Sequence, residues 1–281
     1  MNECTHDCNT CGESCTSRTQ PQSLLEQPHA MSHVKKVVAV CSGKGGVGKS
    51  IVTALLAVLA QRQGLKVGIL DADITGPSIP RAFGLTDKAM GTDDGILPVR
   101  TKTGIDVMSL NLLLENTTDP VVWRGPVIAG AVKQFWTDVI WGEKDILFID
   151  MPPGTGDVVL TVFQSLPVDA AVLVTTPQEL VGMIVEKALK MAGMMNIPTI
   201  GLVENMSYVL CPDCKTKVEV FGQSNVDALA QTYTIPHAAR LPIDPKLSSG
   251  VDKGMIELFT GDWLDGLIDA IVDLPAKEIE A

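Results

Sequence analysis

The residues with the clearest chemistry form a glycine-rich loop, GKGGVGKS, at positions 43–50. The loop matches the phosphate-binding pattern G-x-x-x-x-G-K-[ST] through Gly43, Gly48, Lys49 and Ser50. Its glycines allow backbone N–H groups to surround phosphate oxygens, its lysine reaches the β- and γ-phosphates, and its serine binds Mg²⁺. The predicted nucleotide-binding set is Gly43, Lys44, Gly45, Gly46, Val47, Gly48, Lys49, Ser50 and Ile51.

A second lysine, Lys44, lies just inside this loop and gives the sequence KGGVGKS. In this respect the loop resembles the deviant Walker A motif of the P-loop ATPases related to MinD, ParA and the nitrogenase iron protein. The resemblance implies that Lys44 reaches the nucleotide of a facing subunit, so that two subunits enclose two ATP molecules. A solvated loop lysine is the alternative interpretation.

Carboxylates follow two of the expected strands, in DADITGPSIP at 71–80 and before MPPGTGD at Asp150. Because open parallel sheets bind ligands at the carboxyl ends of their strands, these groups are expected beside the phosphate loop. We expect Asp150 to hold Mg²⁺ partly through water and the amides of 154–156 to sense the γ-phosphate. The same resemblance assigns Asp73 to the attacking water, with Asp71 as the alternative. For Asp71 and Asp157, a helix cap or an Asx-turn is the structural alternative.

Asn205 follows the expected strand 199–203. An asparagine amide can pair with N6 and N7 of adenine, so we interpret Asn205 as the residue that reads the base. The resemblance favours ATP over GTP. A loop asparagine that caps a turn is the alternative, and the proline-rich segment 242–245 is a weaker candidate for a wall of the base site.

Two further cysteines, Cys211 and Cys214, form the sequence CPDC. Two thiolates are half of what a tetrahedral zinc site or an iron–sulfur cluster needs, and two copies across a dimer would supply four. A lone zinc pair and a redox pair are the alternatives. A redox pair belongs at the start of a helix, whereas the segment 215–220 has an extended, charged pattern.

Four more cysteines, Cys4, Cys8, Cys11 and Cys15, lie in a polar N-terminal segment with spacings of three, two and three residues. Such a tetrad can close a complete [4Fe-4S] or zinc site locally. The first three also have the spacing of radical-SAM enzymes, but no barrel strand precedes them. Cys41, by contrast, ends an apolar run and is expected to be a small core residue.

The elements that must position these residues alternate between short apolar runs and helical stretches. This pattern predicts an α/β fold with a mainly parallel, twisted sheet and helices on both faces. The expected strands are 35–42, 66–70, 146–149, 170–174 and 199–203, and the expected helices are 50–63, 126–140, 158–165 and 179–194. An antiparallel hairpin around TKTG is expected within 95–114. The predicted organisation is a Cys-rich tail and linker at 1–33, an ATPase domain at 34–275 and a C-terminal tail at 276–281.

Composition narrows the classes of function. The 281 residues include 22 Lys plus Arg and 33 Asp plus Glu, which gives a net charge of −11. This charge argues against nonspecific binding to nucleic acid or to an anionic membrane, because both require a basic surface. The longest strongly apolar run, 51–60, is too short to span a bilayer, and residues 1–30 lack a signal-peptide core. We therefore expect a cytoplasmic protein.

The deviant Walker A motif, DADITGPS, WRGP at 123–126, IDMPPGTGD, VENMS and CPDC occur in this order along the chain. Together they resemble the Mrp/ApbC family of iron–sulfur cluster carrier ATPases. The resemblance implies a homodimer, slow ATP hydrolysis, a [4Fe-4S] cluster bridging the subunits through Cys211 and Cys214, and transfer to apoproteins. The resemblance does not assign a role to Arg124. It also leaves the N-terminal tetrad unassigned, because relatives that carry four N-terminal cysteines space them more widely than Cys4, Cys8, Cys11 and Cys15 are spaced here.

Two other classes of function remain as alternatives. A positioning ATPase of the MinD/ParA kind would need a basic amphipathic helix or face, but the C-terminal segment 261–281 is acidic. An electron donor like the nitrogenase iron protein would take isolated cysteines from separate loops rather than a C-x-x-C pair.

Overall fold

The structure is a computed structural model, and it describes residues 24–74, 76, 78–114, 125–177 and 181–275. The cysteine tetrad at Cys4, Cys8, Cys11 and Cys15, Arg124 and the predicted C-terminal tail lie outside these ranges. Among the described helices, none has both the length and the apolar character needed to cross a membrane.

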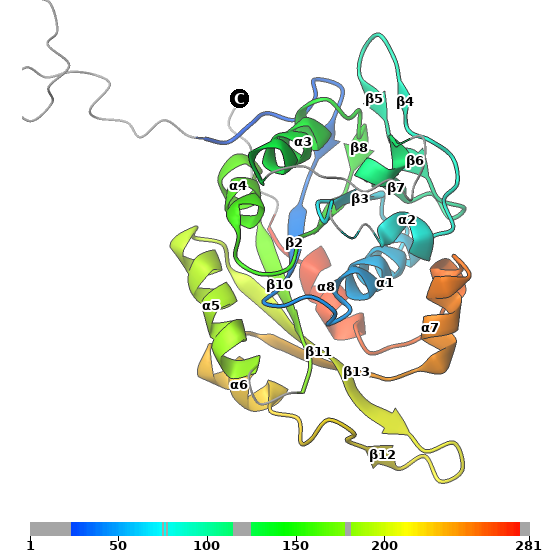
Figure 1. Ribbon diagram of the computed structural model, residues 1–281, viewed down its shortest axis with the longest axis vertical. Coiled ribbons are helices and arrows are strands. Elements are labelled where there is room, and N and C mark those ends of the chain that lie inside the picture. Colours follow the sequence, from blue (N-terminus) through cyan, green and yellow to red (C-terminus); the bar gives the residue numbers. More distant parts are fainter. Residues whose placement is uncertain (1–23, 75, 77, 115–124, 178–180, 276–281) are drawn as a thin grey trace, which may run out of the picture.

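A nine-stranded sheet forms the centre of the molecule, with the strand order β12-β11-β10-β2-β9-β3-β7-β6 and with β13 also paired to β11 (Figure 1). Its strands are β2 (Val37–Ser42), β3 (Val67–Asp71), β6 (Val99–Arg100), β7 (Asp106–Met108), β9 (Ile146–Asp150), β10 (Ala170–Thr175), β11 (Thr199–Leu210), β12 (Lys217–Val218) and β13 (His237–Pro242). The pairings are parallel except β11 with β12 and β6 with β7. The predicted, mainly parallel sheet is confirmed.

Both faces of the sheet are covered by helices (Figure 1). On β2, Ala39 and Cys41 belong to one hydrophobic core, whereas Val38 and Val40 belong to the other. The first core is completed by α3 (Gly125–Thr137), α4 (Asp157–Ser165), α5 (Val181–Met194) and α6 (Val226–Thr232), and the second by α1 (Lys49–Arg62), α2 (Ile79–Ala82), α7 (Pro245–Asp252) and α8 (Asp265–Val272). Strands buried on both faces explain why the sequence shows continuous apolar runs rather than alternation.

The prediction of an antiparallel hairpin within 95–114 is correct only around the TKTG turn. The TKTG turn joins β6 to β7 in antiparallel pairing, but β7 is buried and also pairs in parallel with β3. Upstream, β5 (Ile96–Leu97) pairs instead with β4 (Met90–Gly91), and downstream the chain forms the 3-10 helix η2 (Leu110–Leu112). The segment is therefore an edge extension of the main sheet.

The strand expected at 199–203 was predicted too short. β11 continues to Leu210 because it has pairing partners along its length. β10 and β13 flank its first half, Tyr208 pairs with Pro242 of β13, and the last residues of β11 pair with β12. Asn205, which the sequence placed in a loop, therefore lies inside a strand.

Residues 24–33, which the sequence assigned to the tail and linker, contact the domain in the structure. The amide of Glu26 donates to the Ser165 carbonyl at 2.8 Å, and Trp136 Nε1 donates to the Glu26 carbonyl at 2.9 Å. β1 (His33–Val34) then pairs with β8 (Glu143–Lys144). Residues 24–33 are thus a strap on the domain, held mostly by backbone bonds that apolar periodicity does not reveal.

Candidate functional site

The phosphate loop lies between the end of β2 and the start of α1, as its motif requires. Gly46 and Gly48 have φ angles of 78° and 83°, a left-handed region that favours glycine. A Cβ added at Gly48 would also lie 2.1 Å from Nδ2 of Asn205. Close packing beneath the loop, as well as backbone conformation, therefore requires glycine at this position.

A cavity of about 540 Å³ opens beside the loop. Its walls come from the loop itself, from Asp73 and the start of α2, and from the C-terminal end of α7. The lining residues are Ser42, Gly45, Gly46, Val47, Gly48, Lys49, Ser50, Ile51, Asp73, Gly76, Ser78, Arg81, Pro153, Met206, Val251 and Asp252. The structure thus brings seven of the nine predicted loop residues to one concave surface of a size that suits a small ligand.

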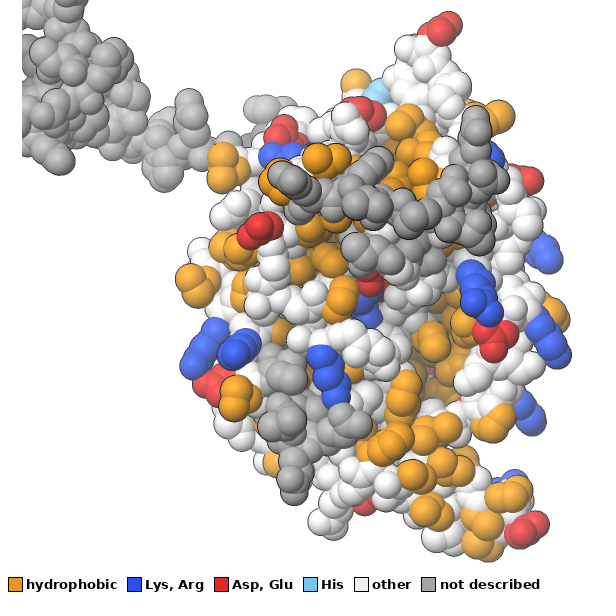
Figure 2. Space-filling model, in the orientation of Figure 1, with side chains coloured by type: hydrophobic (Ala, Val, Ile, Leu, Met, Phe, Trp, Pro, Cys, Tyr) orange, Lys and Arg blue, Asp and Glu red, His pale blue; other side chains and the backbone are white. Residues whose placement is uncertain are grey.

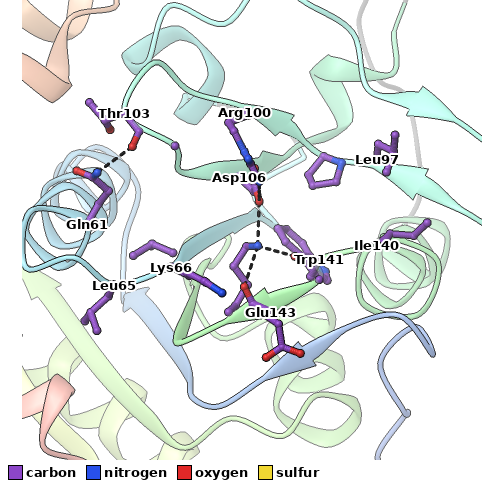
Figure 3. Close-up of a pocket in the computed structure, with 15 residues that line it drawn as sticks. Gln61, Leu65, Lys66, Leu97, Arg100, Thr103, Asp106, Ile140, Trp141 and Glu143 are labelled. Atoms are coloured by element: carbon purple, nitrogen blue, oxygen red, sulfur yellow. Dashed lines mark hydrogen bonds and ion pairs between the residues drawn. The ribbon is translucent and has the colours of Figure 1, made fainter.

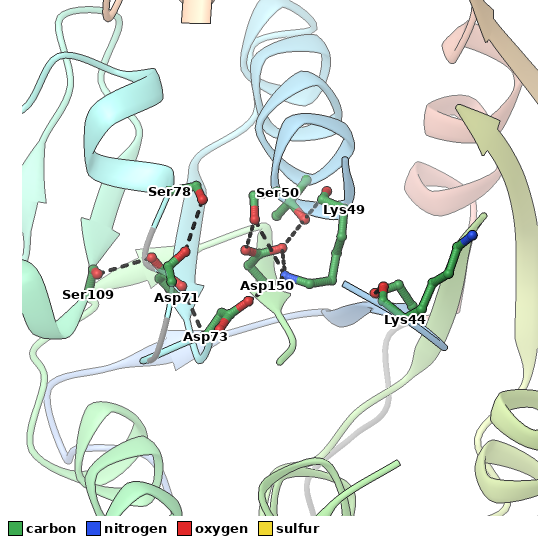
Figure 4. A network of polar contacts seen from close by, with 11 residues as sticks. Lys44, Lys49, Ser50, Asp71, Asp73, Ser78, Ser109 and Asp150 are labelled. Atoms are coloured by element: carbon green, nitrogen blue, oxygen red, sulfur yellow. Dashed lines mark hydrogen bonds and ion pairs between the residues drawn. The ribbon is translucent and has the colours of Figure 1, made fainter. Parts of the chain in front are cut away.

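Asp150 is the centre of a hydrogen-bonded network (Figure 4) that includes Lys49 and Ser50, two residues that line this cavity. Its carboxylate, which is fully buried, accepts hydrogen bonds from Ser50 Oγ at 2.6 Å and Thr53 Oγ1 at 2.7 Å. Lys49 Nζ lies 2.9 Å from Asp150 Oδ1 and 3.7 Å from Asp73 Oδ2. Burial by itself lowers the pKa of Lys49, but the charges of Asp150 and Asp73 outweigh it and the pKa is raised.

Asp71 and Asp73 have different surroundings (Figure 4). Asp71 is 1% exposed, accepts from Ser109 Oγ at 3.0 Å and accepts from the amide of Asp73 at 3.1 Å. Burial, together with the charge of Asp150, raises its pKa well above the usual range. Asp71 therefore forms the Asx-turn that was its structural alternative, whereas Asp73 lines the cavity.

Asn205 supports the phosphate loop from below. Its Nδ2 donates to the Val47 carbonyl at 2.9 Å, and its Oδ1 accepts from the amide of Met206, which has a φ of 56°. In this conformation both ends of the amide are used within the protein, and the side chain is buried. The adenine-reading role stays a prediction, and the contacts show a loop-anchoring role that the sequence did not indicate.

Three other predicted features can be placed around the loop. Lys44 points away from the Lys49–Asp150 network (Figure 4). The amide of Gly154 donates to the Ser42 carbonyl at 2.8 Å, so the segment after β9 is tied to the end of β2. Pro242 ends β13 and Pro245 begins α7, while the residues of this region that line the cavity are Val251 and Asp252.

The cysteine pair lies at the far end of β11, in the turn that joins β11 to β12. The amide of Cys211 donates to the Thr216 carbonyl at 3.0 Å, and the amide of Lys215 donates to the Cys211 carbonyl at 3.0 Å. Cys214 is exposed, and hydrogen bonds from the side chain and backbone of Thr216 lower the pKa of its thiol to about 7. A thiolate is thus accessible near neutral pH, and it is the thiolate that binds metals.

Apolar side chains surround this hairpin, at the end of the molecule where β12 lies (Figure 2). Leu210, Val218, Val220 and Phe221 are between 43% and 56% exposed. Such a cluster next to two thiols is typical of a surface that binds another protein. Cys41, by contrast, is buried in β2, and burial raises the pKa of its thiol to about 12.

A second cavity, of about 560 Å³, lies among the amino ends of β3 and β9 and the β6–β7 turn (Figure 3). The buried carboxylate of Asp106 has two cationic partners here: Lys144 Nζ lies 2.9 Å from its Oδ2, and Nε of the exposed Arg100 lies 2.7 Å from its Oδ1. Lys144 also donates to the Trp141 carbonyl. We interpret Asp106, Lys144 and Arg100 as structural, because these three charges already have partners within the fold.

Comparison with known proteins adds a family to this geometry. The family described as ParA, NUBPL iron-transfer P-loop NTPase, matches residues 33–263. An iron-sulfur cluster carrier protein of Methanocaldococcus jannaschii is 44% identical over 261 residues, which cover 91% of this chain and 90% of that protein. A cytosolic Fe-S cluster assembly factor NUBP2 homolog of Trichoplax adhaerens is 44% identical over 231 residues, covering 80% and 87%.

Solved structures show the same arrangement of elements. A nucleotide-binding protein of Archaeoglobus fulgidus in complex with ADP matches with a TM-score of 0.76 and 44% identity, over 88% of this chain and 95% of that one. The cell division ATPase MinD of Pyrococcus furiosus matches with a TM-score of 0.57 and 20% identity, over 86% and 97%. The second likeness shows the fold alone. Together, the matches confirm the predicted fold and the resemblance drawn from the order of the motifs.

Proposed function

Because the chain belongs to the family of NUBPL iron-transfer P-loop NTPases, we propose that it is an ATP-dependent carrier of iron–sulfur clusters that transfers them to apoproteins. One observation carries this proposal beyond the names of relatives. A single strand, β11, contains the anchor of the phosphate loop, Asn205, and ends beside the half-buried Cys211 and the exposed Cys214. The nucleotide site and the thiols therefore share one rigid element.

The cysteine pair is suited to hold a cluster as cargo. The exposed thiol of Cys214, with a pKa lowered to about 7, and the half-buried thiol of Cys211 supply two ligands on each chain. A [4Fe-4S] cluster takes four, so a second copy of the chain completes the set. The apolar side chains around the hairpin provide a surface for that copy, and accessible thiols allow a client protein to take the cluster. We therefore propose a homodimer with one bridging cluster.

The phosphate loop is suited to bind and hydrolyse ATP. Ser50 Oγ and the Asp150 carboxylate are adjacent oxygen donors, the kind of ligand that Mg²⁺ prefers, so these residues fit a magnesium ion. When bound, Mg²⁺ neutralises phosphate charge. Lys49 supplies an ammonium at the same place, and Asp73 presents a carboxylate to the cavity that can orient water. Lys44 points away from this group (Figure 4), and we propose that it reaches the nucleotide of the facing subunit.

Cluster transfer to an apoprotein tests the proposal. The chain is loaded anaerobically with iron and sulfide, after Cys4, Cys8, Cys11 and Cys15 have been changed to Ser, and is mixed with an apoenzyme whose activity requires a [4Fe-4S] cluster. We expect enzyme activity to return, and to return no longer when Cys211→Ser and Cys214→Ser are added. Cys41→Ala removes a cysteine without touching the hairpin and should leave transfer intact. Equal transfer by the double cysteine variant would contradict the proposal.

A further inference from the structure

The cysteine hairpin is tied to the body of the protein by one arginine on a neighbouring strand. Arg240 lies on β13, and its Nη2 is 2.5 Å from Glu219 Oε1, just beyond β12. We infer that Arg240 and Glu219 are positioning residues that transmit nucleotide occupancy from the phosphate loop to the cysteine pair. This inference rests on the proposed function, since it concerns how the same site is regulated.

The other side of Arg240 reaches the interior of the sheet. Its Nε donates to Ser207 Oγ at 2.8 Å, and Ser207 Oγ donates to Glu204 Oε1 at 2.6 Å. Glu204 is 3% exposed, and the Arg240 guanidinium lies 3.8 Å from its carboxylate, so the arginine compensates a buried charge. The guanidinium thus links a surface carboxylate of the hairpin to a buried carboxylate of β11.

Glu204 is the immediate neighbour of Asn205, whose amide holds the Val47 carbonyl of the phosphate loop. A continuous series of contacts therefore runs from the loop through Asn205 and Glu204 to Arg240 and the hairpin. β11 and β13 are paired at Glu204 and Arg240 themselves, so this series crosses a sheet and not a mobile loop. A displacement of the loop when phosphate binds has a direct route to the thiols.

The hairpin has few other anchors in the part of the chain that the structure describes. β12 pairs with β11 at two positions, Val209 with Val218 and Leu210 with Lys217. Lys217 Nζ also lies 4.5 Å from the centre of the Tyr208 ring, a cation–π contact. Both residues of β12 are exposed. A short, exposed strand of this kind opens readily, so the bond from Arg240 to Glu219 has a large influence on its position.

Hydrogen exchange of the hairpin amides tests this inference. The full-length chain without iron is compared with and without Mg·ADP, with mass spectrometry of peptides that cover residues 209–219. In the unaltered protein we expect Mg·ADP to change the exchange rate by about fivefold or more, within the usual range of coupling between sites. In Glu219→Gln we expect the two rates to become equal while ADP affinity is unchanged, because Glu219 is not among the residues that line the nucleotide cavity. Glu143→Gln, in the equally short strand β8, is the matched control and should keep the full response.

Arg240→Lys provides a second variant, since it keeps a positive charge near Glu204 but cannot bond Ser207 and Glu219 in the same fork. It should show the same loss of response. If the unaltered protein shows no nucleotide-dependent change, or if Glu219→Gln exchanges faster in both states but keeps the ratio between them, the inference is overturned. The experiment uses no cluster, so its failure is distinguishable from failure of the carrier function, which cluster transfer measures separately.

Discussion

Lys49 Nζ and Asp150 Oδ1 lie 2.9 Å apart, and neither side chain is more than 6% exposed. The lysine expected to reach the phosphates is thus held by the carboxylate expected beside Mg²⁺. Binding of nucleotide and metal must lengthen or rearrange this ion pair. The Lys49 ammonium cannot contact phosphate, nor the Asp150 carboxylate Mg²⁺, while the two keep their present contact unchanged. The pair keeps each charge compensated while no phosphate is present.

The first prediction concerns this pair. Lys49→Met and Asp150→Asn should each reduce ATP turnover by about a hundredfold or more, since the first removes the ammonium that meets the phosphates and the second removes a carboxylate that would hold Mg²⁺. Each should also lower the free energy of unfolding by about 3 kcal/mol, because the remaining partner stays buried without its counter-charge. Steady-state phosphate release and urea denaturation measure the two effects.

Lys35→Met is the control for this prediction. It breaks the ion pair with Asp145 on the surface, where the lysine side chain is 52% exposed, and should change neither turnover nor stability measurably. Wild-type turnover by Lys49→Met or Asp150→Asn would show that the assigned role is wrong.

The second prediction concerns the pH dependence caused by Asp71. Since its pKa is raised in the folded state, the folded protein binds this proton more tightly than the unfolded chain does. Stability therefore falls as the pH rises above the unfolded value near 4, by about 1.4 kcal/mol for each unit by which the two pKa values differ. Asp71→Asn cannot ionise and should be more stable than the unaltered protein at pH 8, with a smaller difference at pH 5.

Urea denaturation at the two pH values checks this, and the quantity to compare is the difference between variant and unaltered protein, which cancels other titrating groups. An amide at position 71 can still accept from the Asp73 amide and donate to Ser109. A difference that did not grow between pH 5 and pH 8 would contradict the assignment.

The third prediction separates two roles of Asn205. Asn205→Ala leaves the buried Val47 carbonyl without its donor, which costs about 1–3 kcal/mol and should weaken nucleotide binding about tenfold. If the residue acts as the loop anchor, ADP and GDP lose affinity equally. A selective loss of ADP affinity would instead establish the adenine-reading role. Equilibrium titration with both nucleotides decides between them.

The fourth prediction concerns the N-terminal segment. Removal of residues 1–23 should leave the melting temperature unchanged but remove one metal complement, which we expect to be iron–sulfur, with zinc as the alternative. Removal of residues 1–33 should lower the melting temperature as well, because it takes away the bonds of Glu26 to Ser165 and Trp136. Iron and zinc analysis of the three proteins, together with thermal unfolding, provides the measurement. Unchanged metal content after removal of 1–23 would show that the tetrad binds nothing.

The sequence was most informative where chemistry and structure are local. The phosphate loop, the strand that ends at Asp150 and the C-x-x-C turn each occupy a short continuous segment, and backbone rules place them correctly. Helix and strand ranges followed from apolar runs that are buried on both faces. Only the resemblance favoured Asp73 over Asp71. Packing separates them in the structure, because Asp71 ends β3 and is 1% exposed, whereas Asp73 lies after the strand and lines the cavity.

Contacts between distant segments were not predictable in the same way. Asn205 and Val47 are 158 positions apart, and nothing in either local sequence indicates that they meet. The length of β11 depends on partners at β10, β12 and β13, so propensity within 199–210 could not determine where the strand ends. The contacts of Arg240 and those of the strap around Glu26 could not be predicted for the same reason, since they too join segments that are distant in the sequence.

The central claim is that Cys211 and Cys214 hold a cluster shared between two chains, and native mass spectrometry with iron and sulfide analysis tests it most directly. The protein for this measurement has Cys4, Cys8, Cys11 and Cys15 changed to Ser and is loaded anaerobically. We expect a dimer with about two irons and two sulfides per chain, and no iron after Cys211→Ser and Cys214→Ser are added. A monomer that retains about four irons per chain, or iron that persists in the double variant, would contradict the account.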